Sequence, residues 1–240
     1  MKQPAYEHAT VDLYASYEAW KGWIKPFTIT DDERRYFVGE TCGVAIRDAD
    51  VLEIGFGSGS FLAWARERGA RVAGTEINDV LLSAARERGI ELLDPAIERI
   101  ASGQLNRFNT IVAFDVFEHF SISEILNRLE AAAKMLKPGG HLLLRFPNGQ
   151  SPFGLQAQHG DPTHKSALSR SIFEQLIQGM PFTIVRYRAA HAICGGGIAK
   201  NIVRGLRARI RDAISRALNA IYATDIPWDP VVVLVLRRDE

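Results

Sequence analysis

Three glycines at alternate positions, together with nearby carboxylates, carry the most specific chemistry that this sequence can support. Gly55, Gly57 and Gly59 follow a short apolar run that contains one acidic residue, Glu53. Glycine has no Cβ atom, so such a turn can adopt positive φ angles and leave its backbone amides open to a ligand. We therefore predict a buried strand, then a glycine turn against which a small ligand lies, and then a helix.

Glu53 separates this turn from a phosphate-binding turn. The dinucleotide fingerprint G-x-G-x-x-G would place its third glycine at position 60, where this sequence has Ser60. A carboxylate two residues before the first glycine would repel a pyrophosphate but could accept hydrogen bonds from a cationic ligand. The pattern favours a cationic ligand, with an ordinary strand-to-helix turn that binds nothing as the alternative.

Glu76 stands at the end of the second expected strand, residues 70–75. A carboxylate at this place can bind the two hydroxyl groups of a ribose, and NAD enzymes use the same geometry. Glu76 therefore predicts an adenosine-type ligand without identifying it. A solvated carboxylate at a strand end is the alternative.

Strands and helices alternate along the chain. The run 109–117 is nearly unbroken in apolar residues, as expected for a strand of a parallel sheet that is covered on both faces. A helix over 121–136 has its apolar residues on one stripe. Seven strands are expected in all, at residues 51–54, 70–75, 90–93, 109–117, 141–146, 182–187 and 231–236.

Three motifs in this order resemble those of class I S-adenosylmethionine-dependent methyltransferases. The pattern E-x-G-x-G-x-G at 53–59 is similar to their first motif, and their cofactor carries a sulfonium and an ammonium group. The sequence Phe-Asp-Val-Phe-Glu-His-Phe at 114–120 resembles their fourth-strand motif. Leu-Lys-Pro-Gly-Gly at 136–140, before an apolar strand, is also typical of them. The resemblance covers about residues 46–147.

The resemblance implies an α/β fold with a seven-stranded, mostly parallel sheet of order 3-2-1-4-5-7-6, flanked by helices. It implies one domain over 1–240, with an N-terminal cap (1–45), a donor-binding core (46–147) and a substrate-side part (148–240). S-adenosylmethionine is the expected cofactor. The residues expected to bind it are Glu53, Gly55, Phe56, Gly57, Gly59, Glu76, Ile77, Asp94, Asp115 and Val116.

The candidate catalytic residues come mainly from the connection 147–168, since long loops in a compact domain are usually functional. A histidine can take the proton of an attacking hydroxyl group. Family members often have an Asp-Pro-x-His segment here, so His164 is the first candidate, followed by Asp161; His119 is a second candidate base. No metal site is predicted, because the two histidines of this loop, His159 and His164, and Asp161 fix no coordination geometry.

The expected reaction is in-line displacement of a methyl group from the sulfonium, in which alignment of the reactants matters most. The expected acceptor is a small molecule, a sugar or a lipid-linked glycan, methylated at oxygen. No nucleic-acid-binding module is visible, so nucleic acid is not an expected partner. Two alternatives remain: a protein that binds S-adenosylmethionine or a partner without catalysis, and an NAD-dependent oxidoreductase.

Composition agrees with one such domain. The chain has 240 residues, 47% of them hydrophobic, which is enough for a full core. It has no long apolar run and no signal peptide, so a cytoplasmic location is expected. Cys42 and Cys194 indicate neither a disulfide framework nor a zinc site.

A basic amphipathic helix is expected over 198–223. It holds six basic residues against one acidic residue, Asp212, and apolar residues recur at helical spacing. We favour a helix that packs on its own sheet with solvated arginines, because any surface helix of a globular protein is amphipathic. Peripheral contact with an anionic membrane is the alternative.

Aromatic residues are concentrated near the N-terminus, ahead of a helix that Thr30 is expected to cap, with Glu33 completing the capping box. They could form a lid over the bound methyl donor or a small satellite core. The aromatic residues are Tyr6, Tyr14, Tyr17, Trp20, Trp23 and Phe27.

Overall fold

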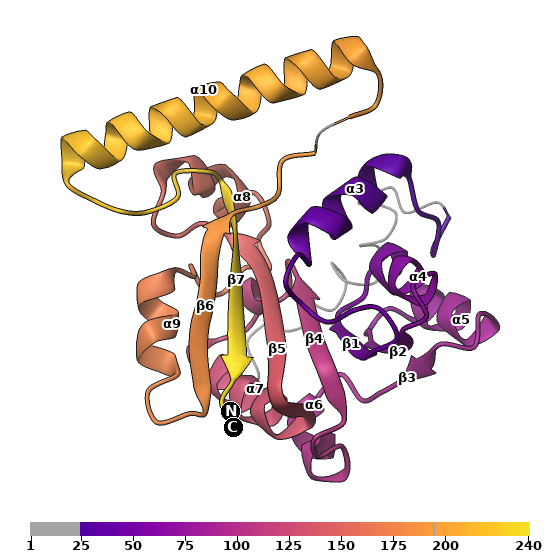
Figure 1. The fold of residues 1–240 in the computed structure, drawn as a ribbon. Helices are drawn as coiled ribbons and strands as arrows, with labels where there is room; N and C mark the ends of the chain where they lie inside the picture. Colours follow the sequence, from indigo (N-terminus) through magenta and orange to yellow (C-terminus); the bar gives the residue numbers. More distant parts are fainter. Residues whose placement is uncertain (1–24, 194) are drawn as a thin grey trace.

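One seven-stranded sheet forms the centre of the computed structural model, which describes residues 25–193 and 195–240 (Figure 1). The strand order is β3-β2-β1-β4-β5-β7-β6, and only β7 runs antiparallel to its neighbours. The predicted fold and strand order are therefore confirmed. The strands are β1 (Asp50–Ile54), β2 (Arg71–Thr75), β3 (Glu91–Leu92), β4 (Phe108–Phe114), β5 (Leu136–Pro147), β6 (Phe182–Ala189) and β7 (Val231–Arg238).

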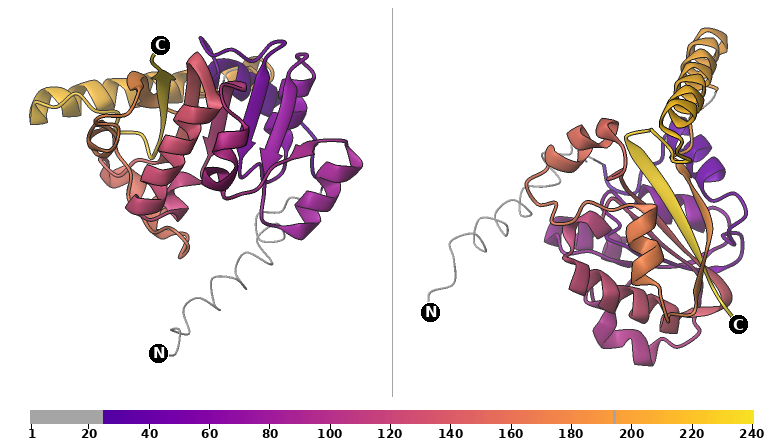
Figure 2. Two further views of the ribbon diagram at one scale, coloured as in Figure 1. Left: turned by 90° about the horizontal axis from the view of Figure 1, so that it is seen from below. Right: turned by 90° about the vertical axis from the view of Figure 1, so that its left-hand side faces the viewer.

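Helices lie on both faces of the sheet, except for one long helix outside it (Figure 2). The α-helices of the described part are α3 (Asp31–Glu40), α4 (Ser60–Arg66), α5 (Asp79–Glu87), α6 (Ile97–Ile100), α7 (Ile122–Met135), α8 (Leu155–His159), α9 (Arg170–Leu176) and α10 (Ile198–Tyr222). Three short 3-10 turns join them: η1 (Ala101–Gly103), η2 (Phe117–His119) and η3 (Pro152–Gly154).

Successive residues of the central strands divide the core into two halves. Val51 and Val112 pack into the cluster that includes residues of α3 and α4, whereas Leu52 and Ile111 pack into the cluster that includes residues of α6, α7 and α9. Side chains alternate between the two faces of a strand, so both faces of β1 and β4 must be apolar. This is why these strands are almost continuous apolar runs in the sequence.

Side-chain caps fix where the helices begin, and so where the loops at the site end. Thr30 and Glu33 form the expected capping box at α3, and Ser121 and Glu124 form another at α7. Asn78 caps α5, because its side chain accepts the amide protons of Val80 and Leu81.

The fourth strand ends earlier than its apolar run suggests. β4 stops at Phe114, and the next residue, Asp115, has φ +56°, a left-handed conformation that a strand cannot contain. Phe117–His119 then forms the turn η2. The expectation of a strand through 117 is wrong, and this early end carries Asp115 and His119 into a loop at the carboxyl edge of the sheet.

Two further differences concern short helices. The connection after β5 is not irregular, since it contains η3 and α8. The helices α6 and α9 have only 4 and 7 residues, too short for a clear periodic pattern. Of the N-terminal aromatic residues, only Phe27 belongs to the described part of the chain; the predictions for the other five lie outside it.

Helix α10 does not pack on the sheet, so the favoured sequence interpretation is wrong. None of its residues is buried, and it lies outside the body of the domain across the end of β6 and β7 (Figures 1 and 2). The half-buried residues of the helix are Arg204, Gly205, Ala208, Ser215, Leu218 and Asn219, whereas most of its large apolar side chains are exposed to solvent. Among the described residues, no helix is long and apolar enough to cross a bilayer.

Candidate active site

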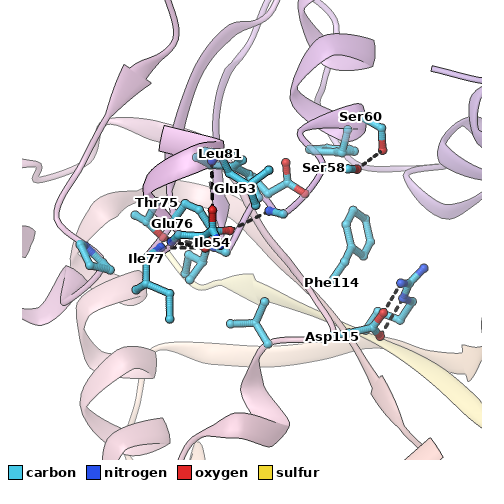
Figure 3. Close-up of a pocket in the computed structure, with 18 of the residues that line it drawn as sticks. Glu53, Ile54, Ser58, Ser60, Thr75, Glu76, Ile77, Leu81, Phe114 and Asp115 are labelled. Carbon is cyan, nitrogen blue, oxygen red and sulfur yellow. Dashed lines mark hydrogen bonds and ion pairs between the residues drawn. The ribbon is translucent and has the colours of Figure 1, made fainter. Parts of the chain in front are cut away.

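A cavity of about 400 Å³ lies at the carboxyl ends of β1, β2 and β4, where the strand order reverses. The glycine turn after β1 forms one wall, and Glu76 and Asp115 lie at separate sides of the opening (Figure 3). Tyr36 and Phe37 of α3 contribute an aromatic wall. Open α/β sheets bind ligands at this position.

The glycine turn has the backbone conformation that the sequence predicts. Gly55 and Gly59 have φ angles of +63° and +71°. A Cβ atom on Gly55 would lie 2.8 Å from Cγ2 of Val116, and one on Gly59 would lie 2.4 Å from the ring of Phe27. The turn therefore tolerates no side chain at either position, and its backbone stays close to the cavity.

Glu76 is fixed at the edge of this turn by three backbone amides. Its Oε2 accepts the N–H of Gly57 at 2.9 Å, and its Oε1 accepts those of Ile77 and Asn78 at 2.7 and 3.1 Å. A carboxylate has about four acceptor positions, so it can still bind a ribose hydroxyl group. The structure thus fixes the Glu76 carboxylate at the edge of the cavity.

Glu53 is buried beside the same cavity, only 3% exposed. Its Oε2 has no hydrogen-bond partner in the described structure, and burial together with the nearby Glu76 raises its pKa well above the usual value. A buried carboxyl group in this state regains its charge when a cation is placed next to it. The orphaned oxygen, the glycine turn and Glu76 together fit a cofactor that carries a sulfonium, an ammonium and a ribose.

Replacement of Glu76 by alanine is expected to weaken S-adenosylhomocysteine binding by roughly 10- to 100-fold. Loss of charge-assisted hydrogen bonds costs about 1.5–3 kcal/mol each, which corresponds to this change in affinity. Calorimetric titration measures it. Glu87→Ala, an exposed carboxylate in the last turn of α5, is the matched control. Equal affinities of both variants and the parent protein would contradict the role of Glu76.

Arg145 is a site residue that the sequence analysis missed. It pairs with Asp115 through Nε and Oδ1 at 2.9 Å and donates a hydrogen bond to Tyr36 Oη at 3.0 Å. The register of the sheet pairs Arg145 of β5 with Phe114 of β4, so Arg145 lies beside the next residue, Asp115. A single arginine in the apolar strand 141–146 was the available signal, because a charge among apolar residues needs a partner.

The predicted cofactor-binding residues are brought together with two exceptions. Gly59 and Asp94 are not among the residues that line the cavity. Gly59 lies at the end of the turn, under Phe27, and Asp94 accepts the N–H of Ala96 at 2.8 Å. The residues that do line the cavity are Glu53, Gly55, Phe56, Gly57, Glu76, Ile77, Asp115 and Val116.

A second cavity, of about 490 Å³, adjoins the first. Asp115 and His119 line both cavities, so they lie at the junction between them. Asp161, His164 and Glu118 line the second cavity but not the first. The candidate catalytic residues of the sequence therefore meet here, although His119 is separated from the others by more than forty positions.

A hydrogen-bonded chain orients His119. The hydroxyl of Thr163 donates to Asp161 Oδ1 at 2.6 Å and lies 2.8 Å from His119 Nδ1. Because this hydroxyl donates to the carboxylate, it accepts the Nδ1 proton of His119. That tautomer places the lone pair on Nε2. Thr163 was not predicted, since a threonine in a loop gives no signal by itself.

His164 is held differently from His119. Its Nδ1 lies 2.9 Å from the carbonyl oxygen of Gln158, and its ring packs edge-on against His119 at 4.7 Å between centroids. Burial and the neighbouring His164 lower the pKa of His119 to about 4, so His119 is neutral at physiological pH. His159 is exposed at the end of α8 and lines neither cavity.

Glu118 is buried next to the two histidines without a hydrogen-bond partner for either carboxylate oxygen in the described structure. Burial and the nearby Asp115 raise its pKa well above the usual value. Glu118, His119 and His164 offer atoms within 4.8 Å of one another, a spacing that metal ligands can have. A neutral Glu118 is the form that this burial favours when no cation is present.

Comparison with known proteins identifies related methyltransferases. A family model described as a methyltransferase domain matches residues 31–187. The ubiquinone biosynthesis O-methyltransferase of Alkalilimnicola ehrlichii is 23% identical over 156 residues, which are 61% of this chain and 62% of that protein. The one of Cronobacter sakazakii is 25% identical over 172 residues, 66% of this chain and 70% of that protein. The matches thus span 62% and 70% of these relatives' length.

Solved structures have the same fold. A SAM-dependent methyltransferase of Archaeoglobus fulgidus superposes with a TM-score of 0.61 at 19% identity, covering 98% of this chain and all of that chain. The 1,6-didemethyltoxoflavin-N1-methyltransferase of Burkholderia thailandensis, solved with S-adenosylhomocysteine, gives 0.58 at 15% identity, covering 100% and 92%. The family match over residues 31–187, together with this fold, shows that the chain belongs to the S-adenosylmethionine-dependent methyltransferases of the methyltransferase domain family.

Proposed function

We propose that this protein transfers a methyl group to a hydroxyl oxygen of a small acceptor that binds in the second cavity. The observation that carries the proposal is the position of His119, which lines both cavities and is oriented by Thr163 and Asp161. A base at this junction is adjacent to the donor and to the acceptor at the same time. The names of the relatives, which are O-methyltransferases, support methylation at oxygen.

When bound, S-adenosylmethionine supplies the electrophilic methyl group. The acceptor oxygen loses its proton to Nε2 of His119, while Nδ1 keeps its hydrogen bond to Thr163. Asp161 remains a carboxylate, since despite burial its hydrogen bonds from Thr163 lower its pKa. The walls of the two cavities align the reactants and exclude water, and alignment supplies most of the rate enhancement in a displacement of this kind.

The low pKa of His119 favours an acidic acceptor hydroxyl. A phenolic hydroxyl has a pKa of about 10, whereas that of an aliphatic hydroxyl is close to the value for water, ~16. Proton transfer to a base with a pKa of about 4 is therefore far less unfavourable from a phenol. Among small-molecule, sugar and lipid-linked acceptors, we propose a phenolic small molecule.

Phenolic acceptors are expected to be methylated and aliphatic polyols of similar size are not. The assay measures S-adenosylhomocysteine release with a dihydroxybenzene series and with sugars, and mass spectrometry locates the new methyl group. EDTA is included as a control, because Glu118, His119 and His164 have the spacing of metal ligands. Methylation of sugars alone, or loss of turnover in EDTA, would contradict the proposal.

The pH profile should report the pKa of His119. A base with a pKa of about 4 stays deprotonated as the pH falls from 8 to 5.5, so kcat/KM should not fall over this range. A histidine with an ordinary pKa near 6.5 would be about nine-tenths protonated at pH 5.5. Measured kcat/KM that falls roughly tenfold by pH 5.5 would contradict a base with a lowered pKa.

A further inference from the structure

The side of helix α10 that faces the domain is held by polar contacts. Arg204 forms an ion pair with Asp32 of α3 at 2.5 Å, and Arg211 forms one with Asp229 at 2.9 Å. At the C-terminal end of the helix, the side chain of Asn219 accepts the indole N–H of Trp228 at 2.7 Å. These contacts hold one face of α10 towards the protein along most of its length.

The opposite side of α10 is a continuous apolar stripe in solvent. Its positions are offset by one or two residues from those of the anchored side, which corresponds to a rotation of roughly 100–200° about the helix axis. The residues of this stripe are 47–85% exposed: Ile198, Ile202, Val203, Leu206, Ile210, Ile214 and Ile221. This orientation is the reverse of the usual one, in which the apolar face of a surface helix packs on the core.

Basic residues border the stripe on both sides. Lys200 and Arg207 lie along one border, and Arg209 and Arg216 along the other, as their spacing on the helix requires. All four are exposed, and none takes part in an ion pair given by the described structure. An apolar stripe between two rows of cations is complementary to a surface with apolar chains below and anionic groups above.

We propose that α10 is a membrane-surface helix, which lies in the headgroup region of an anionic bilayer with its apolar stripe inserted. Such helices bind through the apolar area they bury and through attraction of their basic residues to anionic lipids. A second copy of this chain fits less well. Pairing two such stripes would bring both rows of basic residues of one copy against those of the other, with unfavourable charge repulsion.

The attachment of α10 also connects this surface to the second cavity. Asn219 accepts the backbone N–H of Ile226 at 3.4 Å, and the segment that begins there continues to Pro230 and Val231, which line the cavity. The hydroxyl of Ser151, the residue before η3, donates to the carbonyl oxygen of Trp228 at 2.6 Å. Seating of α10 on a bilayer would therefore hold the acceptor cavity close to the lipid surface. The membrane proposal itself does not depend on the nature of the acceptor.

Co-sedimentation with lipid vesicles tests the proposal on the full chain. The vesicles are phosphatidylcholine alone, and an equimolar mixture of phosphatidylcholine and phosphatidylglycerol. The parent protein is expected to pellet with the mixed vesicles, more weakly at high salt and more weakly with phosphatidylcholine alone. The double variant Ile202→Glu/Ile210→Glu is expected to bind at least ~10-fold more weakly, because it puts charge into the stripe.

The matched control is Leu105→Glu/Val80→Glu, which makes the same change in charge at two exposed apolar residues away from α10. It is expected to bind vesicles like the parent protein. Circular dichroism establishes that each variant is folded. Failure of the parent protein to bind the mixed vesicles would overturn the proposal, as would equal loss in both variants. A dimer in solution that only the α10 variant dissociates, without vesicle binding, would assign the stripe to self-association instead.

Discussion

His119→Gln is expected to lower kcat by roughly 10²- to 10⁴-fold, the usual contribution of a positioned general base. Glutamine fills a similar volume and can still donate a hydrogen bond towards Thr163, but it cannot take up a proton. S-adenosylhomocysteine should bind the variant with nearly unchanged affinity, because Glu76 and Glu53, the carboxylates expected to bind its ribose and its ammonium group, are unchanged. Stopped assays of product formation at saturating acceptor, together with calorimetry, separate the two effects.

Thr163→Val is the companion variant, since it removes only the hydroxyl that links His119 to Asp161. It should lower kcat less than His119→Gln, and it should shift the acid limb of the pH profile, because the tautomer of His119 is no longer fixed. His164→Ala should leave kcat within a few-fold, because His164 lines the second cavity but not the cavity of the methyl donor. A large loss in His164→Ala with little loss in His119→Gln would transfer the role of base to His164.

Glu40→Ala is expected to lower the free energy of unfolding by about 3 kcal/mol, the lower end of the range for a broken buried ion pair. Glu40 is completely buried; its Oε1 lies 3.0 Å from Arg188, and its Oε2 accepts the N–H of His191 at 2.6 Å. Alanine would leave the N–H of His191 without its acceptor, and Arg188 with only the carbonyl oxygens of Gly39 and Ala189. Arg188 is one-third exposed, so water compensates part of its loss. Urea denaturation measures the change.

Glu40→Gln is the control for this variant. The amide oxygen of glutamine can still accept from His191, so most of the packing and one hydrogen bond remain. We expect a smaller loss of stability than with alanine. Glu40 lies at the end of α3, whose residues Tyr36 and Phe37 line the cofactor cavity, so Glu40→Ala should also weaken cofactor binding. An unfolding free energy equal to that of the parent protein would show that α3 is held mainly by its aromatic core.

The connection after β5 shows which site residues a local sequence pattern can predict and which it cannot. Its Asp-Pro-Thr-His segment identified Asp161 and His164, yet the partner that orients the base, Thr163, has no distinctive pattern. Arg145 is similar: it is visible as a charge in an apolar strand, but its pairing with Asp115 depends on the register of β4 and β5. Such pairs join residues that are far apart in the chain, so the periodicity of the sequence does not predict these contacts.

Contiguous residues determined the elements of the fold and the glycine turn of the first cavity, and the resemblance to a known family implied the strand order. The alternation of strands and helices, the glycine turn after β1 and Glu76 at the end of β2 each follow from local backbone conformation and side-chain periodicity. Tertiary structure decided the rest. It placed His119 between two cavities, and it turned the apolar side of α10 to solvent. An amphipathic pattern predicts that a helix has an apolar and a polar face. The ion pairs of Arg204 and Arg211 with distant acidic residues determine which of these faces lies towards the rest of the domain.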